Sequence, residues 1–253
     1  MASIVSAMAP FYGARTAARQ YWADLKDRIA FRRRQRLGHE PKVSIDWASE
    51  IVSLGHGEGR WFVHAPSLRP GDLCYSFGVG YDISFDRDLI ARFGAVVHAF
   101  DPTPRSLAWI SKQSLPATFH FHPFGLGARD ELREFSLPTT HDVSFSTLTG
   151  LERTDVATCQ VHRLSTIREM LKHESIALLK LDIEGAEYEV VPQLISEAPH
   201  IRQVLIEFHH RLLPSSTALQ ETTRVVDGLR SAGFRLIHRS PRGIEYVFLR
   251  RDP

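Results

Sequence analysis

Short apolar segments alternate with segments of helical spacing from Gly71 to the end of the chain. The segments predicted as strands cover residues 73–77, 96–100, 118–122, 176–181 and 203–208. The predicted helices cover residues 85–93, 106–112, 165–172, 187–195 and 217–232. Strands joined through helices require a parallel sheet with right-handed crossovers. Two closing strands, 234–238 and 245–250, flank a tight turn and must therefore be antiparallel.

The composition is that of a globular protein and excludes several other classes. Of the 253 residues, 43% are hydrophobic and 24% are charged, which fits a single domain with a substantial core. Two cysteines, Cys74 and Cys159, are too few for a disulfide scaffold or a cysteine-rich zinc cluster. They fit a reducing compartment, so we expect a cytoplasmic protein. A net charge of +2 gives no electrostatic case for nucleic-acid binding, and no apolar run reaches the roughly 18 residues of a transmembrane span.

Residues 1–60 are predicted to form a helical extension that precedes a main domain at residues 61–253. The first ten residues lack the basic region and apolar block of a secretory signal, and a transit peptide stays open. Two further short strands are expected at residues 61–63 and 131–137.

The extension contains one amphipathic helix, because apolar residues recur at helical spacing over residues 11–29. Tyr21, Trp22 and Leu25 share a face that we expect to pack on the main domain or on a partner subunit, which would give a homodimer. Five arginines between positions 28 and 36 fit a solvated helix end or a contact with phosphate or anionic lipid. A basic run alone favours the solvated end.

A glycine turn with Gly78 and Gly80 follows the strand at residues 73–77, and the next strand ends at Asp101. A glycine turn with an acid about 20 residues later indicates a nucleoside site, in which the acid binds the ribose hydroxyls. A dinucleotide site would need a third glycine where the chain has Ile83, and Asp82 places negative charge where phosphates would lie. The pattern therefore favours S-adenosylmethionine over NAD.

Charged side chains gather where the next two strands end. Lys180 and Asp182 share one side of their strand, and a lysine in an apolar strand calls for an ion pair. Glu207 and His209 follow on the neighbouring strand and would point toward Asp182. We predict Asp182, Glu207 and His209 as catalytic, with His209 as the general base because the ordinary pKa of histidine lies near neutral pH.

A metal site at this edge stays open as an alternative. Carboxylates of Asp182, Glu184 and Glu207 with the imidazole of His209 would suit magnesium or manganese. The interpretation that we favour contains no metal. The adjacent His210 is expected to be a solvated surface residue.

Three segments, at residues 75–86, 98–104 and 180–187, resemble FkbM-type methyltransferases, a branch of the class I S-adenosylmethionine-dependent enzymes. The resemblance extends from about Trp61 to the C-terminus. It implies an α/β fold with a Rossmann-like, mostly parallel sheet of seven strands that ends in the antiparallel pair.

The resemblance also implies cofactor contacts from Gly78, Gly80, Asp82, Asp101, Phe124, Gly125 and Asp182. Asp101 would hold the ribose hydroxyls, and Phe124 with Gly125 would lie near the adenine. Many class I enzymes carry an acid where this chain has Ser76, so Asp82 is expected to contact the cofactor's amine instead. The polar loop at residues 143–146 either covers the cofactor or has no ligand role.

The resemblance implies O-methyl transfer to a saccharide or a small natural product, with a base to take the proton of the acceptor hydroxyl. Two alternatives remain: a non-catalytic protein that binds the cofactor or a partner through the arginine-rich segment, and an NAD-dependent oxidoreductase.

Overall fold

The computed structural model describes residues 14–138, 153–212 and 215–250. The loop at residues 143–146 and the first ten residues, both discussed above, lie outside these ranges. None of the described helices combines the length and the apolar character that a membrane span requires.

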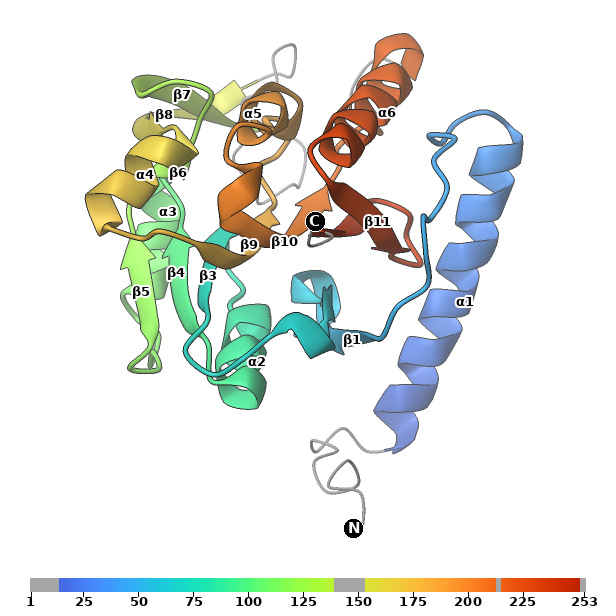
Figure 1. The fold of residues 1–253 in the computed structure, drawn as a ribbon, viewed down its shortest axis with the longest axis horizontal. Coiled ribbons are helices and arrows are strands. Elements are labelled where there is room, and N and C mark those ends of the chain that lie inside the picture. Colours follow the sequence, from blue (N-terminus) through green and yellow to red (C-terminus); the bar gives the residue numbers. More distant parts are fainter. Residues whose placement is uncertain (1–13, 139–152, 213–214, 251–253) are drawn as a thin grey trace.

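A seven-stranded sheet forms the centre of the fold, in the order β11–β12–β10–β9–β3–β4–β5 (Figure 1). The strands are β3 (Leu73–Phe77), β4 (Val96–Phe100), β5 (Phe119–His122), β9 (Ile176–Leu181), β10 (Ile201–Glu207), β11 (Phe234–Arg239) and β12 (Glu245–Arg250). β12 runs antiparallel to β10 and β11, and the other pairs are parallel. The Rossmann-like α/β sheet with its antiparallel C-terminal pair is therefore confirmed. The strand order changes direction between β3 and β9.

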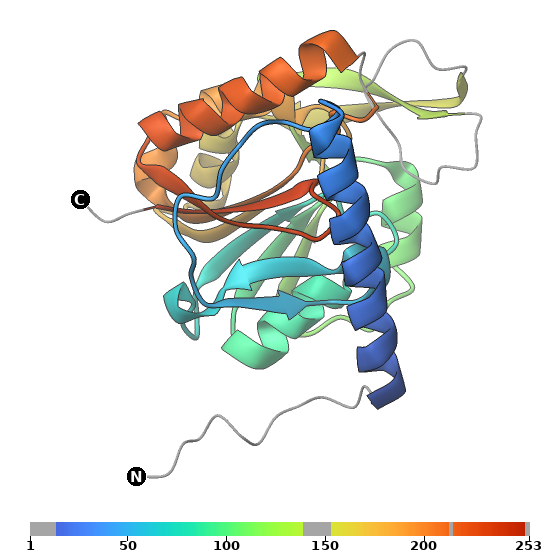
Figure 2. The same ribbon diagram turned by 90° about the vertical axis from the view of Figure 1, so that its right-hand side faces the viewer.

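Helices cover both faces of the sheet (Figures 1 and 2). One face carries α4 (Leu164–Leu171), α5 (Glu187–Leu194) and α6 (Ser215–Ser231), and the other carries α2 (Ser84–Phe93) and α3 (Pro104–Ile110). Successive residues of β3 point to opposite faces, so Tyr75 and Phe77 join the first core and Cys74 joins the second. Gly94 ends α2 in the left-handed conformation, as its position after the helical pattern predicts.

Two smaller sheets and three short 3₁₀ helices complete the fold. β1 (Ile51–Leu54) pairs with β2 (Trp61–His64), and β8 (Arg153–His162) lies between β6 (Gly125–Leu126) and β7 (Glu131–Pro138). The 3₁₀ helices are η2 (Gly57–Gly59), η3 (Ala65–Ser67) and η4 (Ala198–His200). The sequence predicts β2 and β7 but misses β1, β6 and β8. Since β1 pairs with β2, the expected boundary at residue 60 falls inside a hairpin.

α1 (Ala14–Arg36) confirms the N-terminal helix but not its packing on the main domain. The side chains of Tyr21 and Trp22 are 64% and 59% exposed, and Leu25 is half-buried. The helix lies along the β11 side of the molecule (Figures 1 and 2). Among the described residues, nothing covers the aromatic face, so its expected burial against the main domain is wrong.

Asp24 and Phe31 are among the residues that hold α1 against the body. Arg60 forms an ion pair with Asp24, at 2.5 Å. Phe31 is 7% exposed and lies under the guanidinium of Arg239, at 4.4 Å from the ring centre. These contacts come from Phe31 in the C-terminal half of α1 and from Asp24 near its middle.

The segment after α1 carries a buried carboxylate. Glu40 is 1% exposed and accepts from Arg34 at 2.6 Å and from Arg211 at 2.7 Å. His210 lies 2.8 Å from its other oxygen and is 2% exposed. The expectation that His210 is solvated is therefore wrong, because a residue 170 positions away in the sequence supplies its partner.

Candidate active site

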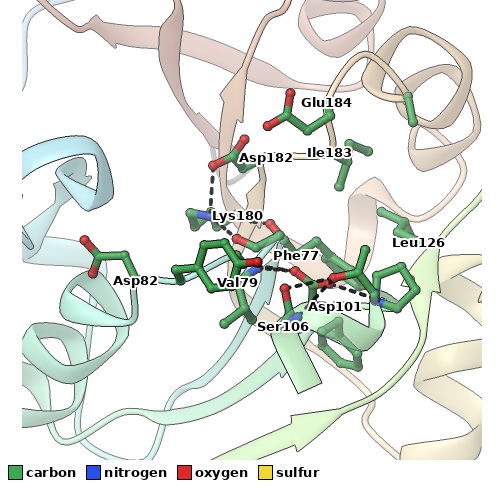
Figure 3. A pocket seen from close by; sticks show the side chains of 18 of the residues that line it. Phe77, Val79, Asp82, Asp101, Ser106, Leu126, Lys180, Asp182, Ile183 and Glu184 are labelled. Carbon is green, nitrogen blue, oxygen red and sulfur yellow. Dashed lines mark hydrogen bonds and ion pairs between the residues drawn. The ribbon is translucent and has the colours of Figure 1, made fainter. Parts of the chain in front are cut away.

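A cavity of about 280 Å³ opens at the carboxyl ends of β3 and β9, where the strand order changes direction (Figure 3). Ligands of open α/β sheets bind at this kind of position, because the loops that follow the two strands diverge there. Of the predicted cofactor residues, those that line the cavity are Gly78, Gly80, Asp82, Asp101, Gly125 and Asp182. The site predicted from sequence is thus gathered around one space.

The glycine turn brings the backbone of β3 against that of β9. Gly78 has φ +82°, and an added Cβ would collide with the carbonyl oxygen of Asp182. Gly80 has φ +54°, and an added Cβ there would meet no described atom within 4 Å. Gly78 is therefore required for packing within the protein, whereas Gly80 leaves backbone open to a ligand.

Asp101 holds this turn in place. One carboxylate oxygen accepts from the N–H groups of Val79 and Gly80, at 3.1 and 2.9 Å, and the other from the backbone and hydroxyl of Thr103, at 2.9 and 2.6 Å. The four lone-pair positions of the carboxylate are thus all in use. A ribose hydroxyl would have to replace one donor. The Thr103 hydroxyl can turn to Ser106 instead, at 2.9 Å.

The remaining predicted cofactor residues differ in whether they line the cavity. Asp82 lines it and accepts from the Ser84 N–H at the start of α2, at 2.6 Å. Gly125 lines it from β6. Phe124 is not among the lining residues and packs against Phe100, with ring centres 5.6 Å apart. The contact that the structure shows for Phe124 is packing in the core. Its position near the adenine stays a prediction.

Lys180 is buried beneath the cavity and confirms the expected ion pair. Its Nζ lies 3.6 Å from Asp182, donates to the carbonyl of Gly78 at 3.1 Å, and sits 4.6 Å from the centre of the Trp61 ring. The lysine therefore ties the end of β3 to the end of β9 and offsets the charge of Asp182 (Figure 3).

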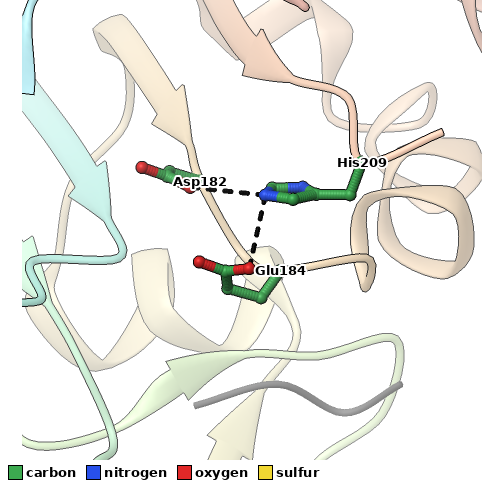
Figure 4. Close-up of side chains that lie close together, drawn as sticks. All are labelled: Asp182, Glu184 and His209. Atoms are coloured by element: carbon green, nitrogen blue, oxygen red, sulfur yellow. Dashed lines mark ion pairs between the residues drawn. The ribbon is translucent and has the colours of Figure 1, made fainter. Parts of the chain in front are cut away.

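His209 lies behind Asp182, surrounded by carboxylates (Figure 4). Its Nε2 is 3.4 Å from Glu184 and 3.9 Å from Asp182, and its Nδ1 is 3.2 Å from the fully buried Glu187. Burial alone would lower the pKa of His209, but Glu187, Glu184 and Glu207 outweigh it and raise the pKa to about 10. The predicted base is therefore an imidazolium at neutral pH. We predicted His209 as the general base because the ordinary pKa of histidine lies near neutral pH. That reason is wrong, because the surrounding carboxylates raise the pKa of His209.

Glu207 lies outside the cavity lining, with Arg242 at 3.9 Å. Burial and the charge of Asp182 raise the pKa of Glu207 to about 8. Of the three predicted catalytic residues, only Asp182 therefore lines the cavity. His209 adjoins it through Asp182, and Glu207 lies outside the lining.

Asp182, Glu184 and His209 are the described residues that could hold a metal, since one ligand atom of each lies within 4.8 Å of the others. Two carboxylates and an imidazole suit magnesium or manganese. The proton on His209 supplies one positive charge against the two carboxylates of this cluster.

Sequence reasoning missed several residues that line the cavity, namely Glu58, Tyr81, Asp86, Arg105 and Arg133. Arg133 comes from β7 and forms an ion pair with Glu189 at the start of α5, at 2.9 Å. No local pattern relates β7 to the strand ends. Asp86 could have been found, because it lies one helical turn after Asp82 and is an acid on the inner face of α2.

The Methyltransferase FkbM domain family matches residues 78–236, which is more than half of the chain and includes the glycine turn, Asp101 and the end of β9. The chain belongs to this family. A human relative described as probable methyltransferase-like protein 24 is 27% identical over 137 residues, which are 53% of this chain. The match covers 32% of that relative, so this FkbM chain corresponds to about a third of its length.

Solved structures with a similar arrangement include an FkbM methyltransferase from Methylobacillus flagellatus and a fibrillarin from Aeropyrum pernix with natively bound S-adenosyl-L-methionine. The first is 16% identical and covers 71% of this chain and 43% of its own, with a TM-score of 0.44. The second is 9% identical and covers 82% of this chain and 84% of its own, with a TM-score of 0.42.

Proposed function

We propose that this FkbM family member transfers a methyl group from S-adenosylmethionine to a hydroxyl oxygen. The observation that carries the proposal is the cavity between the ends of β3 and β9, lined by an open glycine backbone and by acids. A sulfonium nucleoside with an amino-acid end needs carboxylates and a close backbone approach, whereas a dinucleotide needs a phosphate cradle. Ile83, which is 3% exposed and part of the core, leaves no such cradle.

The cofactor would supply a methyl group on a positively charged sulfur, which becomes a neutral thioether when an acceptor oxygen takes the methyl. The protein's tasks are to align the two reactants and to exclude water. Asp182 would accept the proton of the acceptor hydroxyl, because its carboxylate is the predicted catalytic group that reaches the cavity. His209 keeps its own proton and positions the Asp182 and Glu184 carboxylates beside the cavity.

We further infer that the acceptor is a saccharide or a small natural product, and that the methyltransferase unit is residues 61–253. We keep the expectations of a cytoplasmic protein, of a homodimer, and of no nucleic-acid partner. The near-neutral charge balance of the chain supports the last of these. The acceptor class comes from family resemblance.

Calorimetric titration tests the cofactor assignment. We expect S-adenosylhomocysteine to bind and NAD not to bind. Asp101→Ala should weaken S-adenosylhomocysteine by about 1–3 kcal/mol, since it removes the group that holds the glycine turn. Thr103→Val, which leaves the bonds to Val79 and Gly80 in place, should cost less. Tight NAD binding, or unchanged affinity in Asp101→Ala, would refute the assignment.

Turnover separates the roles of Asp182 and His209. Asp182→Asn should lower kcat about 10²–10⁴-fold, the usual contribution of a general base. His209→Ala should lower kcat less and leave S-adenosylhomocysteine affinity unchanged, since His209 does not line the cavity. A chelator should not change kcat. A metal requirement would instead assign Asp182, Glu184 and His209 to an ion.

A further inference from the structure

A buried polar group lies beneath the cavity, between the sheet and α2. Ser76 of β3 and Lys180 of β9 are register partners, so both side chains point to the α2 face. Asp86, in the first turn of α2, meets them there and lines the cavity. Asp86 and Ser76 are 3% and 2% exposed. A carboxyl that lines the cavity and a buried hydroxyl beside it thus meet between α2 and the sheet.

Both groups have acceptor atoms without a partner. Among the described residues, no hydrogen bond reaches Oδ1 of Asp86 or Oγ of Ser76. Lys180 does not fill this role, because it donates to the carbonyls of Phe77 and Gly78 and forms its ion pair with Asp182. Burial raises the pKa of Asp86, and the charge of Lys180 and the nearby hydroxyl of Ser76 oppose this rise. A buried acceptor without a donor is costly, so the site is suited to a ligand that brings donors and positive charge.

Asp82, which sequence reasoning assigned to the cofactor's amine, already has a structural task. It accepts from the Ser84 N–H at 2.6 Å, and its carboxylate packs against Gly59, where an added Cβ would lie 2.5 Å from Oδ2. Asp82 fixes the loop of η2 against the start of α2. Asp86, one turn later, is the acid whose oxygen remains available.

We propose that Asp86, together with Ser76, binds the primary ammonium at the amino-acid end of S-adenosylmethionine. The inference rests on the proposed function and adds the residue that recognises this end. An ammonium has three donors and one positive charge, so it can serve both unpartnered acceptors at once. Asp86 thus brings a carboxylate from the first turn of α2 to the cavity beside Ser76 of β3.

Two ligands that differ only at the amino-acid end provide the test. S-adenosylhomocysteine carries the ammonium, and 5′-methylthioadenosine lacks the whole amino-acid part. We expect Asp86→Asn to weaken S-adenosylhomocysteine at least tenfold and to change 5′-methylthioadenosine less than twofold. Asp88→Asn, on the same helix but outside the cavity lining, is the matched control and should change neither.

The outcomes separate this inference from the proposed function. If the wild-type chain binds neither nucleoside, the proposed function fails. If it binds both, and Asp86→Asn weakens them equally or not at all, only the role of Asp86 fails. Selective loss of S-adenosylhomocysteine in Asp82→Asn but not in Asp86→Asn would return the amine to Asp82.

A second variant covers the case in which Asp86→Asn does not fold. Ser76→Ala removes the other unpartnered acceptor and should also weaken S-adenosylhomocysteine selectively, by about three- to tenfold. Ser76→Asp in the Asp86→Asn background should restore binding, because it returns a carboxylate to the same space. Equal effects of Ser76→Ala on both nucleosides would contradict the proposal.

Discussion

Two glycines of one turn differ in what they require from the fold. Gly78 faces the Asp182 carbonyl at positive φ, and Gly80 faces open space, also at positive φ. The first position combines backbone strain with a collision against immobile backbone, whereas the second carries strain alone. The turn therefore joins β3 to β9 at Gly78 and presents backbone to the ligand at Gly80.

Alanine substitutions measure this difference. Gly80→Ala should lower the free energy of unfolding by about 1–2 kcal/mol, the cost of left-handed conformation for an alanine. Gly78→Ala should cost more than about 3 kcal/mol, since the carbonyl of Asp182 must also move. Urea unfolding followed by circular dichroism compares the two. Equal losses would show that Gly78 has room that the structure does not give it.

At the scale of elements, β3, β4 and β5 enclose a group of histidines on the α4 side of the sheet. His98 and His122 lie 2.9 Å apart, and Tyr75 lies 2.8 Å from His173. Burial, with the neighbouring histidines, lowers the pKa of His98 to about 3 and also lowers those of His122 and His173. His98 is therefore neutral in the folded protein well below pH 6, and His122 and His173 are harder to protonate than an ordinary histidine.

Acid should destabilise the protein through these histidines. Their pKa values are lower in the folded than in the unfolded chain, so only the unfolded chain takes up protons as the pH falls below about 6.5. Stability from this source is fully present above that pH, and we expect His98 to account for a loss of about 1–2 kcal/mol on going from pH 7.5 to pH 5. Urea unfolding at the two pH values measures it. His98→Leu should reduce the slope, and the exposed His39→Ala should not; identical slopes for His98→Leu and wild type would contradict this origin.

At the scale of the whole molecule, the described part of the main domain does not cover the aromatic face of α1, which contains Tyr21 and Trp22. A second copy of the chain is the other partner that the sequence analysis expected for this face. We expect the wild-type chain to sediment as a dimer, and Tyr21→Glu with Trp22→Glu to sediment as a monomer. Leu132→Glu, at a residue that is 67% exposed on β7, is the control and should remain dimeric. A wild-type monomer at micromolar concentration would exclude the dimer.

The seven strands of the main sheet and helices α2 to α6 were all predicted from the sequence. Each shows its own pattern of apolar residues, a short apolar run for a strand or helical spacing for a helix. β8 was missed. Its ten residues include Thr154, Asp155 and Gln160, and its pairing depends on β7 more than on its own apolar pattern. The exposure of the α1 face could not be predicted either, since periodicity identifies a face but not what covers it.

The sequence by itself determined the order of strands and helices, the glycine turn, and the Lys180–Asp182 ion pair, because these depend on residues that are close along the chain. Only the tertiary structure decided the protonation of His209, the burial of His210 against Glu40, and the position of Asp86 opposite Ser76. Each of these depends on the charge and solvent exclusion that a distant segment brings. The spacing of residues along the chain indicates neither this charge nor this exclusion of solvent.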